Sequence, residues 1–430
     1  MNLYPYTRRS LYRAILVALI LSLTFAVAAN AESPPTFIAE WGSYGRGDGQ
    51  FMYPSDVATD SSGNVYVVDT YNSRIQKFDS DGTFLAKWGS RGTGDGQFRY
   101  PSGLAVDRWD NVYVADTSNN RIQKFDSDGT FLAKWGSSGS GEGQLKFPMD
   151  VAVDRWDNVY VADASNNRIQ KFDSDGTFLA KWGSRGMGNG QFNLPSGVAV
   201  DSSDNVYVAD ASNNRIQKFD SDGTFRTEWG SYGSGDGQFS GPSSVAVDSS
   251  DNVYVADMGN NRIQKFHSDG MFRTQWGSYG TGDGRFRDAS SVALDSSGNV
   301  YVADKKNNRI QKFSSPAIIA EIDIKTGGNP NTINPRSRGR IPLAILTTDA
   351  LDATTVDPTT VRFGATGTEA RPVKSALEDV DDDGDTDMIL HFKTRDTRIK
   401  CGDNSAFLSG KTFGGERIEG ADDVRTVGCR

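Results

Sequence analysis

The order of apolar and polar positions along the chain returns six times with a period of 47 residues. Each copy holds short runs of β-branched and aromatic residues, such as VYVAD and RIQKF, separated by clusters of Gly, Asn, Asp and Ser. Such runs between turn-forming residues predict four short β-strands in every copy. The copies begin with TFIAEWGS at Thr36, TFLAKWGS at Thr83, Thr130 and Thr177, TFRTEWGS at Thr224 and MFRTQWGS at Met271.

The runs NVYVAD and VAVD are apolar at nearly every position instead of alternating between apolar and polar. This pattern is typical of sheets that are covered on both faces. A four-stranded sheet that returns at this period predicts the blade of a β-propeller. The chain enters the repeat on 36–42 and leaves it after 309–313, so we expect 36–42 to complete the sixth blade beside 292–313. We therefore predict an all-β fold, with a six-bladed β-propeller over residues 36–316.

Two sets of residues recur in all six copies and are predicted to build the blades. One Trp per copy, Trp41 in the first, is expected to pack between neighbouring blades. The Asp that ends each second strand, Asp69 in the first copy, stands five residues before an Arg, here Arg74. We expect each such Asp and Arg to form an ion pair at a turn.

The pattern P-x-x-V-A-V-D, N-V-Y-V-A-D, N-N-R-I-Q-K-F-D and D-G-x-F resembles the NHL repeat in all six copies, over roughly residues 36–316. The resemblance implies a six-bladed β-propeller. It does not imply one function, because propellers of this kind serve many ends.

The repeat stops at Ser315-Pro316, and a second domain is predicted over residues 317–430. The segments 318–324, 340–347, 359–364, 386–392 and 405–410 read as strands, which predicts a smaller β-sandwich-like domain. The region resembles a module found at the C-termini of secreted bacterial proteins. Its two cysteines, Cys401 and Cys429, are the only ones in the chain, and we expect one disulfide between them.

A loop in this domain has the spacing of a calcium site. Acidic residues stand at its positions 1, 3, 5, 7 and 9, and Gly384 stands at position 6, where the turn is needed. Position 12 is Leu390 instead of a bidentate Glu, so the loop resembles strand-flanked DxDxDGxxD loops. Structural calcium is predicted here, and crowded acids in an exposed turn are the alternative. The predicted ligands are Asp379, Asp381, Asp383, Asp385 through its carbonyl oxygen, and Asp387.

The first 31 residues read as a signal peptide, with Arg8, Arg9 and Arg13 before the apolar run 14–29 and a small-x-small cleavage site at 29–31. We expect a secreted, periplasmic or extracellular protein with no membrane span after cleavage. Export by the general or the twin-arginine route and a retained anchor stay open. The net charge of −9 argues against nucleic acid as a partner, because such binding rests on neutralising phosphates.

A partner-binding face is predicted where the six copies differ. The loops before each first strand and after each second strand lie at one end of the blades and vary most. Tyr and Arg are common at contact surfaces, so a protein or glycan partner is expected there, with drift of solvated loops as the alternative. The turn DRWDN places two Trp at the opposite end, as a contact patch or folded over neighbouring turns. The predicted partner-binding residues are Tyr44, Tyr53, Tyr71, Arg91, Arg99, Tyr100, Phe147 and Arg185, with Trp109 and Trp156 at the opposite end.

The sequence offers few of the groups that catalytic propellers use. Its two histidines, His267 and His391, lie far apart in the chain and give no histidine metal cluster or Ser-His-Asp set. The gluconolactonase-like propellers hold a metal with an asymmetric Glu/Asn/Asp set in the channel, whereas we expect the acids here to recur symmetrically as residues of the repeat. We therefore expect a monomeric binding protein and no enzyme. A lyase or hydrolase with a metal in the central channel is the first alternative, and an RNA-binding NHL protein is the second.

Overall fold

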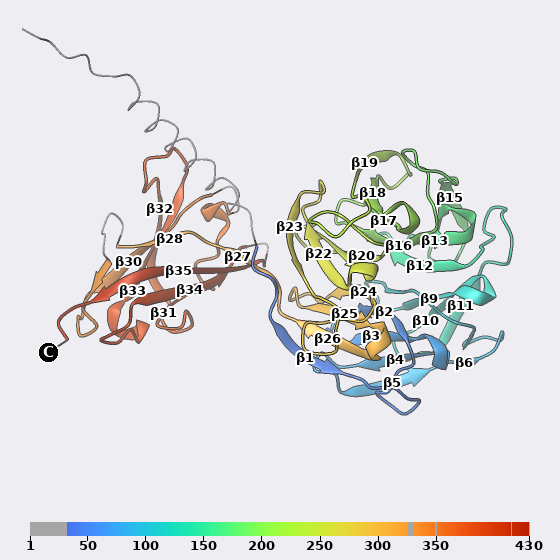
Figure 1. Ribbon diagram of the computed structural model, residues 1–430, viewed down its shortest axis with the longest axis horizontal. Coiled ribbons are helices and arrows are strands. Elements are labelled where there is room, and N and C mark those ends of the chain that lie inside the picture. Colours follow the sequence, from blue (N-terminus) through green and yellow to red (C-terminus); the bar gives the residue numbers. More distant parts are fainter. Residues whose placement is uncertain (1–31, 326–330, 349–350, 414, 430) are drawn as a thin grey trace, which may run out of the picture. The chain divides into compact units, whose positions relative to one another are not determined.

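The computed structural model describes residues 32–325, 331–348, 351–413 and 415–429 (Figure 1). The chain divides into a propeller unit, Pro34–Pro316, and a C-terminal unit built mainly from Ala317–Phe413 and Arg417–Arg430. The described residues form β-strands and short 3-10 turns, and none of their helices is long and apolar enough to cross a membrane. The predicted signal peptide lies outside the described residues.

The propeller unit consists of six four-stranded antiparallel sheets, as the repeat predicts. The first three blades are β2 (Pro54–Thr59), β3 (Val65–Asp69), β4 (Arg74–Phe78), β5 (Phe84–Trp88); β8 (Leu104–Val106), β9 (Val112–Asp116), β10 (Arg121–Phe125), β11 (Phe131–Trp135); and β12 (Pro148–Val153), β13 (Val159–Asp163), β14 (Arg168–Phe172), β15 (Phe178–Trp182). The next two are β16 (Pro195–Val200), β17 (Val206–Asp210), β18 (Arg215–Phe219), β19 (Phe225–Trp229); and β20 (Pro242–Val247), β21 (Val253–Asp257), β22 (Arg262–Phe266), β23 (Phe272–Trp276). The sixth is β24 (Ala289–Leu294), β25 (Val300–Asp304), β26 (Arg309–Phe313) and β1 (Phe37–Trp41). The prediction of an all-β, six-bladed propeller is confirmed.

Short connections complete the blades. The second and third strands of the blades are joined by the 3-10 turns η1 (Thr70–Asn72), η2 (Thr117–Asn119), η3 (Ala164–Asn166), η4 (Ala211–Asn213), η5 (Met258–Asn260) and η6 (Lys305–Asn307). The parallel pair β6 (Ser90–Arg91) and β7 (Gln97–Phe98) lies in the Gly-rich loop before the second blade.

The first strand closes the ring. β1 pairs antiparallel with β26, with Trp41 opposite Ile310, so the N-terminal strand supplies the outer edge of the blade that the chain finishes last. Glu40 forms an ion pair with Arg309 across this junction. Closure in this way leaves no blade without its fourth strand, as the sequence predicted.

Adjacent blades pack through the recurrent aromatic residues. Trp88 of the first blade lies against the turn of the second, where a Cβ at Gly129 would stand 2.5 Å from its indole ring. Gly129 also has a φ of +86°, so both space and backbone require glycine at this turn. Trp88 is 6.0 Å from Phe125 of the second blade between ring centroids. The recurrent Trp is therefore a packing residue between blades, as predicted.

The C-terminal unit consists of two sheets around one apolar core. One sheet contains β27 (Ala317–Ile319), β29 (Asn331–Ile333), β31 (Arg362–Gly364), β34 (Ser405–Lys411) and β35 (Arg417–Thr426). The other contains β28 (Ile322–Ile324), β30 (Arg340–Ile345), β32 (Pro372–Glu378) and β33 (Asp387–Lys393), and the turns η7 (Ala353–Thr355) and η8 (Thr394–Thr397) accompany them. Phe363 of the first sheet and Phe392 of the second are buried with ring centroids 5.0 Å apart.

Candidate functional site

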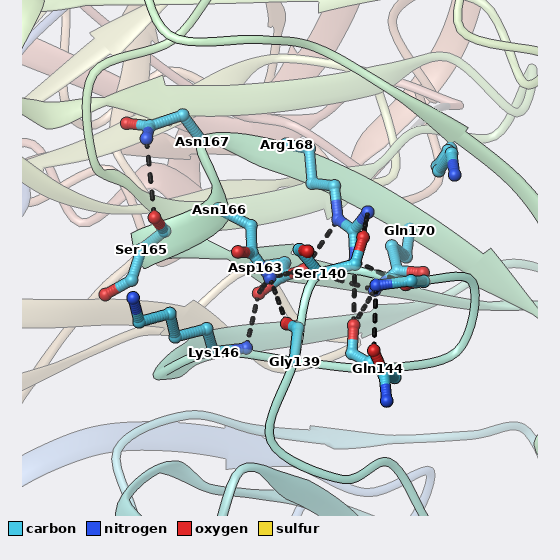
Figure 2. A network of polar contacts seen from close by, with 12 residues as sticks. Gly139, Ser140, Gln144, Lys146, Asp163, Ser165, Asn166, Asn167, Arg168 and Gln170 are labelled. Carbon is cyan, nitrogen blue, oxygen red and sulfur yellow. Dashed lines mark hydrogen bonds and ion pairs between the residues drawn. The ribbon is translucent and has the colours of Figure 1, made fainter.

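A buried ion pair in each blade holds the loop that reaches the variable face. In the third blade the Nε of Arg168 donates to Asp163 at 2.7 Å, and its remaining nitrogens donate to the carbonyl oxygens of Ser140, Gly141 and Gln144 (Figure 2). These contacts recur in the other blades, for example between Arg121 and Asp116. The predicted Asp–Arg pairs thus fix the Gly-rich loops from which the variable residues project.

The axis of the ring opens on this face into a cavity of about 740 Å³. All six blades contribute to it, because the first strand of every blade lies along the channel. Its wall combines a few large side chains with many serines. The lining residues include Ser55, Asp56, Tyr71, Tyr100, Ser102, Phe147, Met149, Asp150, Ser196, Ser243, Ser290 and Lys305.

Three of the predicted partner-binding residues, Tyr53, Tyr71 and Tyr100, form one aromatic group that extends into this cavity. Tyr71 lies between Tyr53 and Tyr100, with ring centroids 5.1 and 5.4 Å away, and Arg91 stands 6.0 Å from the ring of Tyr100. Tyr71 is 54%, Tyr100 42% and Phe147 48% exposed. Tyr71, Tyr100 and Phe147 line the cavity, so the first three blades give it an aromatic wall.

The other predicted residues of this face do not join that wall. Tyr44 and Arg185 lie on their Gly-rich loops, in single bridges to Phe51 and Phe192. The backbone N–H of Arg99 donates to Asp116 at 2.8 Å, which ties its loop to the second blade. None of the three lines the cavity.

Two carboxyl groups inside the channel break the repeat. Asp56 and Asp150 occupy the same repeat position, and both are buried. The equivalent residues of the other blades are Gly103, Gly197, Ser244 and Ser291. The expectation that the acids of the channel recur in every copy is therefore wrong. The two departures are visible in the sequence alone, directly before the V-A-V run.

Backbone groups hold both carboxyl groups in place. Asp56 accepts hydrogen bonds from the N–H of Leu104 at 2.6 Å and of Val57 at 2.9 Å, and from the hydroxyl of Ser291. Burial raises the pKa of Asp56 to about 6, against the lowering effect of these hydrogen bonds.

Asp150 is held in the same way. It accepts from the N–H of Val151 at 2.8 Å and of Val198 at 2.9 Å. Burial, followed by the charge of Asp56, raises the pKa of Asp150 well above its usual value. The pair thus shares a site in which one proton is retained more readily than in water.

Comparison with protein families decides what the repeat is. A family model for the NHL repeat matches residues 51–78, 98–125, 145–172, 192–219, 239–266 and 286–313. The chain contains six NHL repeats. A comparison with curated protein sequences gives no match.

The NHL propeller is similar to several solved structures. Virginiamycin B lyase from Staphylococcus aureus is 13% identical, with a TM-score of 0.41 over 60% of this chain and 79% of that one. A streptogramin B lyase is 14% identical, with a TM-score of 0.47 over 64% and 97%. A gluconolactonase from Xanthomonas campestris is 16% identical, with a TM-score of 0.47 over 66% and 98%. At such identities the likeness concerns the fold alone.

The expectation that this chain is not an enzyme is corrected by these matches. The three solved propellers named above are two lyases and a gluconolactonase. The prediction of no enzymatic activity rested on two arguments. The two histidines give no metal cluster or Ser-His-Asp set, and the acids were expected to recur in every copy. Asp56 and Asp150 contradict the second argument, so the sequence does not exclude an enzyme.

The two exposed Trp lie at the other end of the NHL blades, in the turns after β8 and β12. Trp109 is 68% and Trp156 65% exposed, and their indole N–H groups donate to Asp157 at 3.4 Å and Asp204 at 3.0 Å on the next blade. Each edge is thus tied to a neighbouring turn, while most of each ring faces solvent.

The predicted calcium loop follows β32 in the C-terminal unit. Asp379, Asp381 and Asp387 bring one carboxylate oxygen each to within 4.8 Å of one another. Asp383 is not in this group, and its carboxylate accepts from the N–H of Asp385 at 2.9 Å. Three of the predicted ligands are therefore close enough to share an ion, and calcium itself stays a prediction.

The predicted disulfide is present in the same unit. It joins Cys401 and Cys429, whose Cα atoms are 5.7 Å apart. It ties the end of β35 to the loop before β34.

Proposed function

We propose that this protein is exported and binds a protein or glycan partner through the face around the central cavity. The observation that carries the proposal is the aromatic wall of Tyr71, Tyr100 and Phe147, which breaks an otherwise regular ring. Aromatic side chains that are held in place and half exposed beside a cavity are typical of binding sites. The recurrent Asp, Arg and Trp side chains instead form the ion pairs within the blades and the packing between them.

Three features support the remaining parts of the proposal. The signal-like leader and the disulfide favour an oxidising compartment outside the cytoplasm. The acidic net charge disfavours a nucleic-acid partner. Calcium at Asp379, Asp381 and Asp387 would have a structural role, since the loop belongs to the C-terminal unit. We further propose that the protein acts as a monomer.

The proposal is tested by removing the aromatic wall. The variant Tyr71→Ala/Tyr100→Ala is compared with Tyr232→Ala/Tyr279→Ala, whose tyrosines are even more exposed but do not line the cavity. Binding is measured on a glycan array and by crosslinking in the native cell envelope. Loss of two contact residues that together contribute about 2 kcal/mol predicts about a 30-fold weaker partner affinity in the first variant only. Equal binding by both variants would contradict the proposal.

A further inference from the structure

We infer that the central cavity receives a primary ammonium group of the ligand, placed between Asp56 and Asp150 and against the aromatic wall. The inference rests on the site of the proposed function and adds the chemical group that the site selects. It is carried by three separate features of the cavity, namely its hydrogen-bond acceptors, its unpaired carboxyl groups and its aromatic side.

The serines of the cavity offer acceptors, because their protons are already used. Each hydroxyl donates to a backbone carbonyl oxygen of the next blade, so toward a ligand its oxygen can act only as an acceptor. These bonds run from Ser55 to Ser102 at 2.6 Å, Ser102 to Met149 at 2.6 Å, Ser196 to Pro242 at 2.9 Å, Ser243 to Ser290 at 2.8 Å and Ser290 to Pro54 at 3.2 Å. One lone pair of the Ser55 oxygen is already used by the hydroxyl of Thr70, which donates to it at 2.7 Å. A ligand that brings several N–H or O–H donors is therefore favoured over one that brings acceptors.

The two carboxyl groups favour a ligand that carries a positive charge. Within the described residues neither Asp56 nor Asp150 forms an ion pair, and the hydrogen bonds to them come from backbone N–H groups and from Ser291. A carboxylate can accept about four hydrogen bonds, so each retains acceptor capacity toward the channel. Buried charge without a partner is costly, and a bound cation removes that cost.

The aromatic side favours an organic ammonium group over a metal ion. Calcium and magnesium take six or more oxygen ligands, preferably carboxylate and carbonyl oxygens, whereas the lining around the carboxyl groups combines serine hydroxyls with the side chains of Tyr71, Tyr100, Phe147 and Met149. Aromatic faces attract ammonium groups, and three N–H donors can reach both carboxylates and a serine oxygen. The one group of three or more potential metal ligands among the described residues lies in the C-terminal unit instead.

The charged groups around the channel set the pH dependence of such binding. Asp56 on β2 and Asp150 on β12 face it, and the equivalent positions of β16, β20 and β24 and of the segment before β8 carry only Gly or Ser. Lys305 on η6 lines the cavity, and burial lowers its pKa. An ammonium group binds the ionised carboxylates, so affinity should fall as the pH falls through 6, where Asp56 takes up a proton.

The test uses the full chain and two pairs of probes in titration calorimetry. One pair is the trimer of glucosamine and its N-acetylated form, and the other is Nα-acetyl-lysine methylamide and its Nε-acetylated form. We expect at least one amine to bind about ten-fold or more tightly than its acetylated counterpart, because acetylation removes the charge. The amine that binds identifies an amino sugar or a lysine side chain as the source of the ammonium group.

The matched variant is Asp56→Ser/Asp150→Ser, which installs the residue that blades five and six already carry at this position. It should keep the fold and lose the preference for the amine, and lowering the pH from 7.5 to 5 should weaken amine binding in the wild type alone. The inference is overturned if neither amine is preferred, or if the serine variant keeps the preference. Partner binding that still depends on Tyr71 and Tyr100 would then leave the proposed function standing without the ammonium group.

Discussion

At the residue scale, the residues that build the blades differ from those that we propose to bind a ligand, and the repeat position of Asp56 and Asp150 shows this difference. The blades are built from polar residues that form hydrogen bonds and ion pairs with one another. Arg121, for example, donates to Asp116 and to the carbonyl oxygens of its loop. Asp56 and Asp150 do the opposite, because each places a carboxyl group in a buried channel without an ion pair among the described residues. Gly or Ser fills the position in the other four blades, so the fold does not require an acid there.

This difference predicts an unusual pH dependence of stability. The pKa of Asp56 is about 6 in the folded protein and near 3.8 in the unfolded chain, so between these values the unfolded chain has released a proton that the folded protein still holds. Stability from this group therefore falls as the pH rises from 4 to 6 and stays low above 6. Two pKa units correspond to about 3 kcal/mol of unfolding free energy.

The variant Asp56→Ser isolates this contribution. Urea unfolding of variant and wild type at pH 4, 5, 6 and 7 should show the variant gaining about 3 kcal/mol relative to the wild type across that range. Ser244→Ala, at the same repeat position without a carboxyl group, serves as the control and should show a constant difference. A constant difference for Asp56→Ser as well would mean that burial does not perturb this group.

At the element scale, β1 carries the closure of the ring. It gives β26 its second neighbour and places Trp41 against Phe78 of the first blade, with ring centroids 6.0 Å apart. Without it, β26 would present an unpaired edge, which is a template for association.

A chain that starts at Ser43 should therefore melt at lower temperature and associate, whereas one that starts at Pro34 should behave as the mature protein does. Loss of a packed Trp alone costs about 3–5 kcal/mol. Thermal unfolding and size-exclusion chromatography measure both effects, and a synthetic peptide of residues 34–42 added to the shorter chain should reverse them. A monomeric shorter chain with an unchanged melting temperature would show that the ring closes without β1.

The strands of the propeller could be predicted, and part of the C-terminal unit could not. Six copies of one pattern determine the strands of the blades, because an ambiguous strand in one copy can be assigned from the other five. β32 and β35 were missed for a physical reason. β32 is largely exposed at the edge of its sheet, and β35 carries Asp422, Asp423 and Gly420 in a strand that is paired on both sides. The predicted strand 318–324 is divided at Ala320 and Glu321 because its halves, β27 and β28, join different sheets.

At the scale of the whole molecule, the ring creates a site that the linear sequence conceals. Tyr71, Tyr100 and Phe147 could be named from sequence because they stand in loops that differ between copies. Asp56 and Asp150 stand two repeats apart inside the regular strand pattern, where a single substitution looks like drift. Only the closed arrangement places both in one channel beside that aromatic wall.

The division into two units predicts that calcium acts on one of them alone. Asp379, Asp381 and Asp387 belong to the C-terminal unit, so chelation should lower the melting temperature of that unit and leave the propeller transition unchanged. Calcium at 100 times its dissociation constant adds about 2.7 kcal/mol, which corresponds to a shift of roughly 10 °C or more in a domain of this size.

Differential scanning calorimetry with calcium or with EGTA measures the two transitions separately. Asp379→Asn/Asp381→Asn should abolish the response to EGTA, because it removes two of the three carboxylates that converge. Asp128→Asn/Asp175→Asn removes the same charge from exposed turns of the propeller and should keep the response. A melting curve that EGTA leaves unchanged in the wild type would remove calcium from this loop, and the three acids would then be solvated charges in a turn.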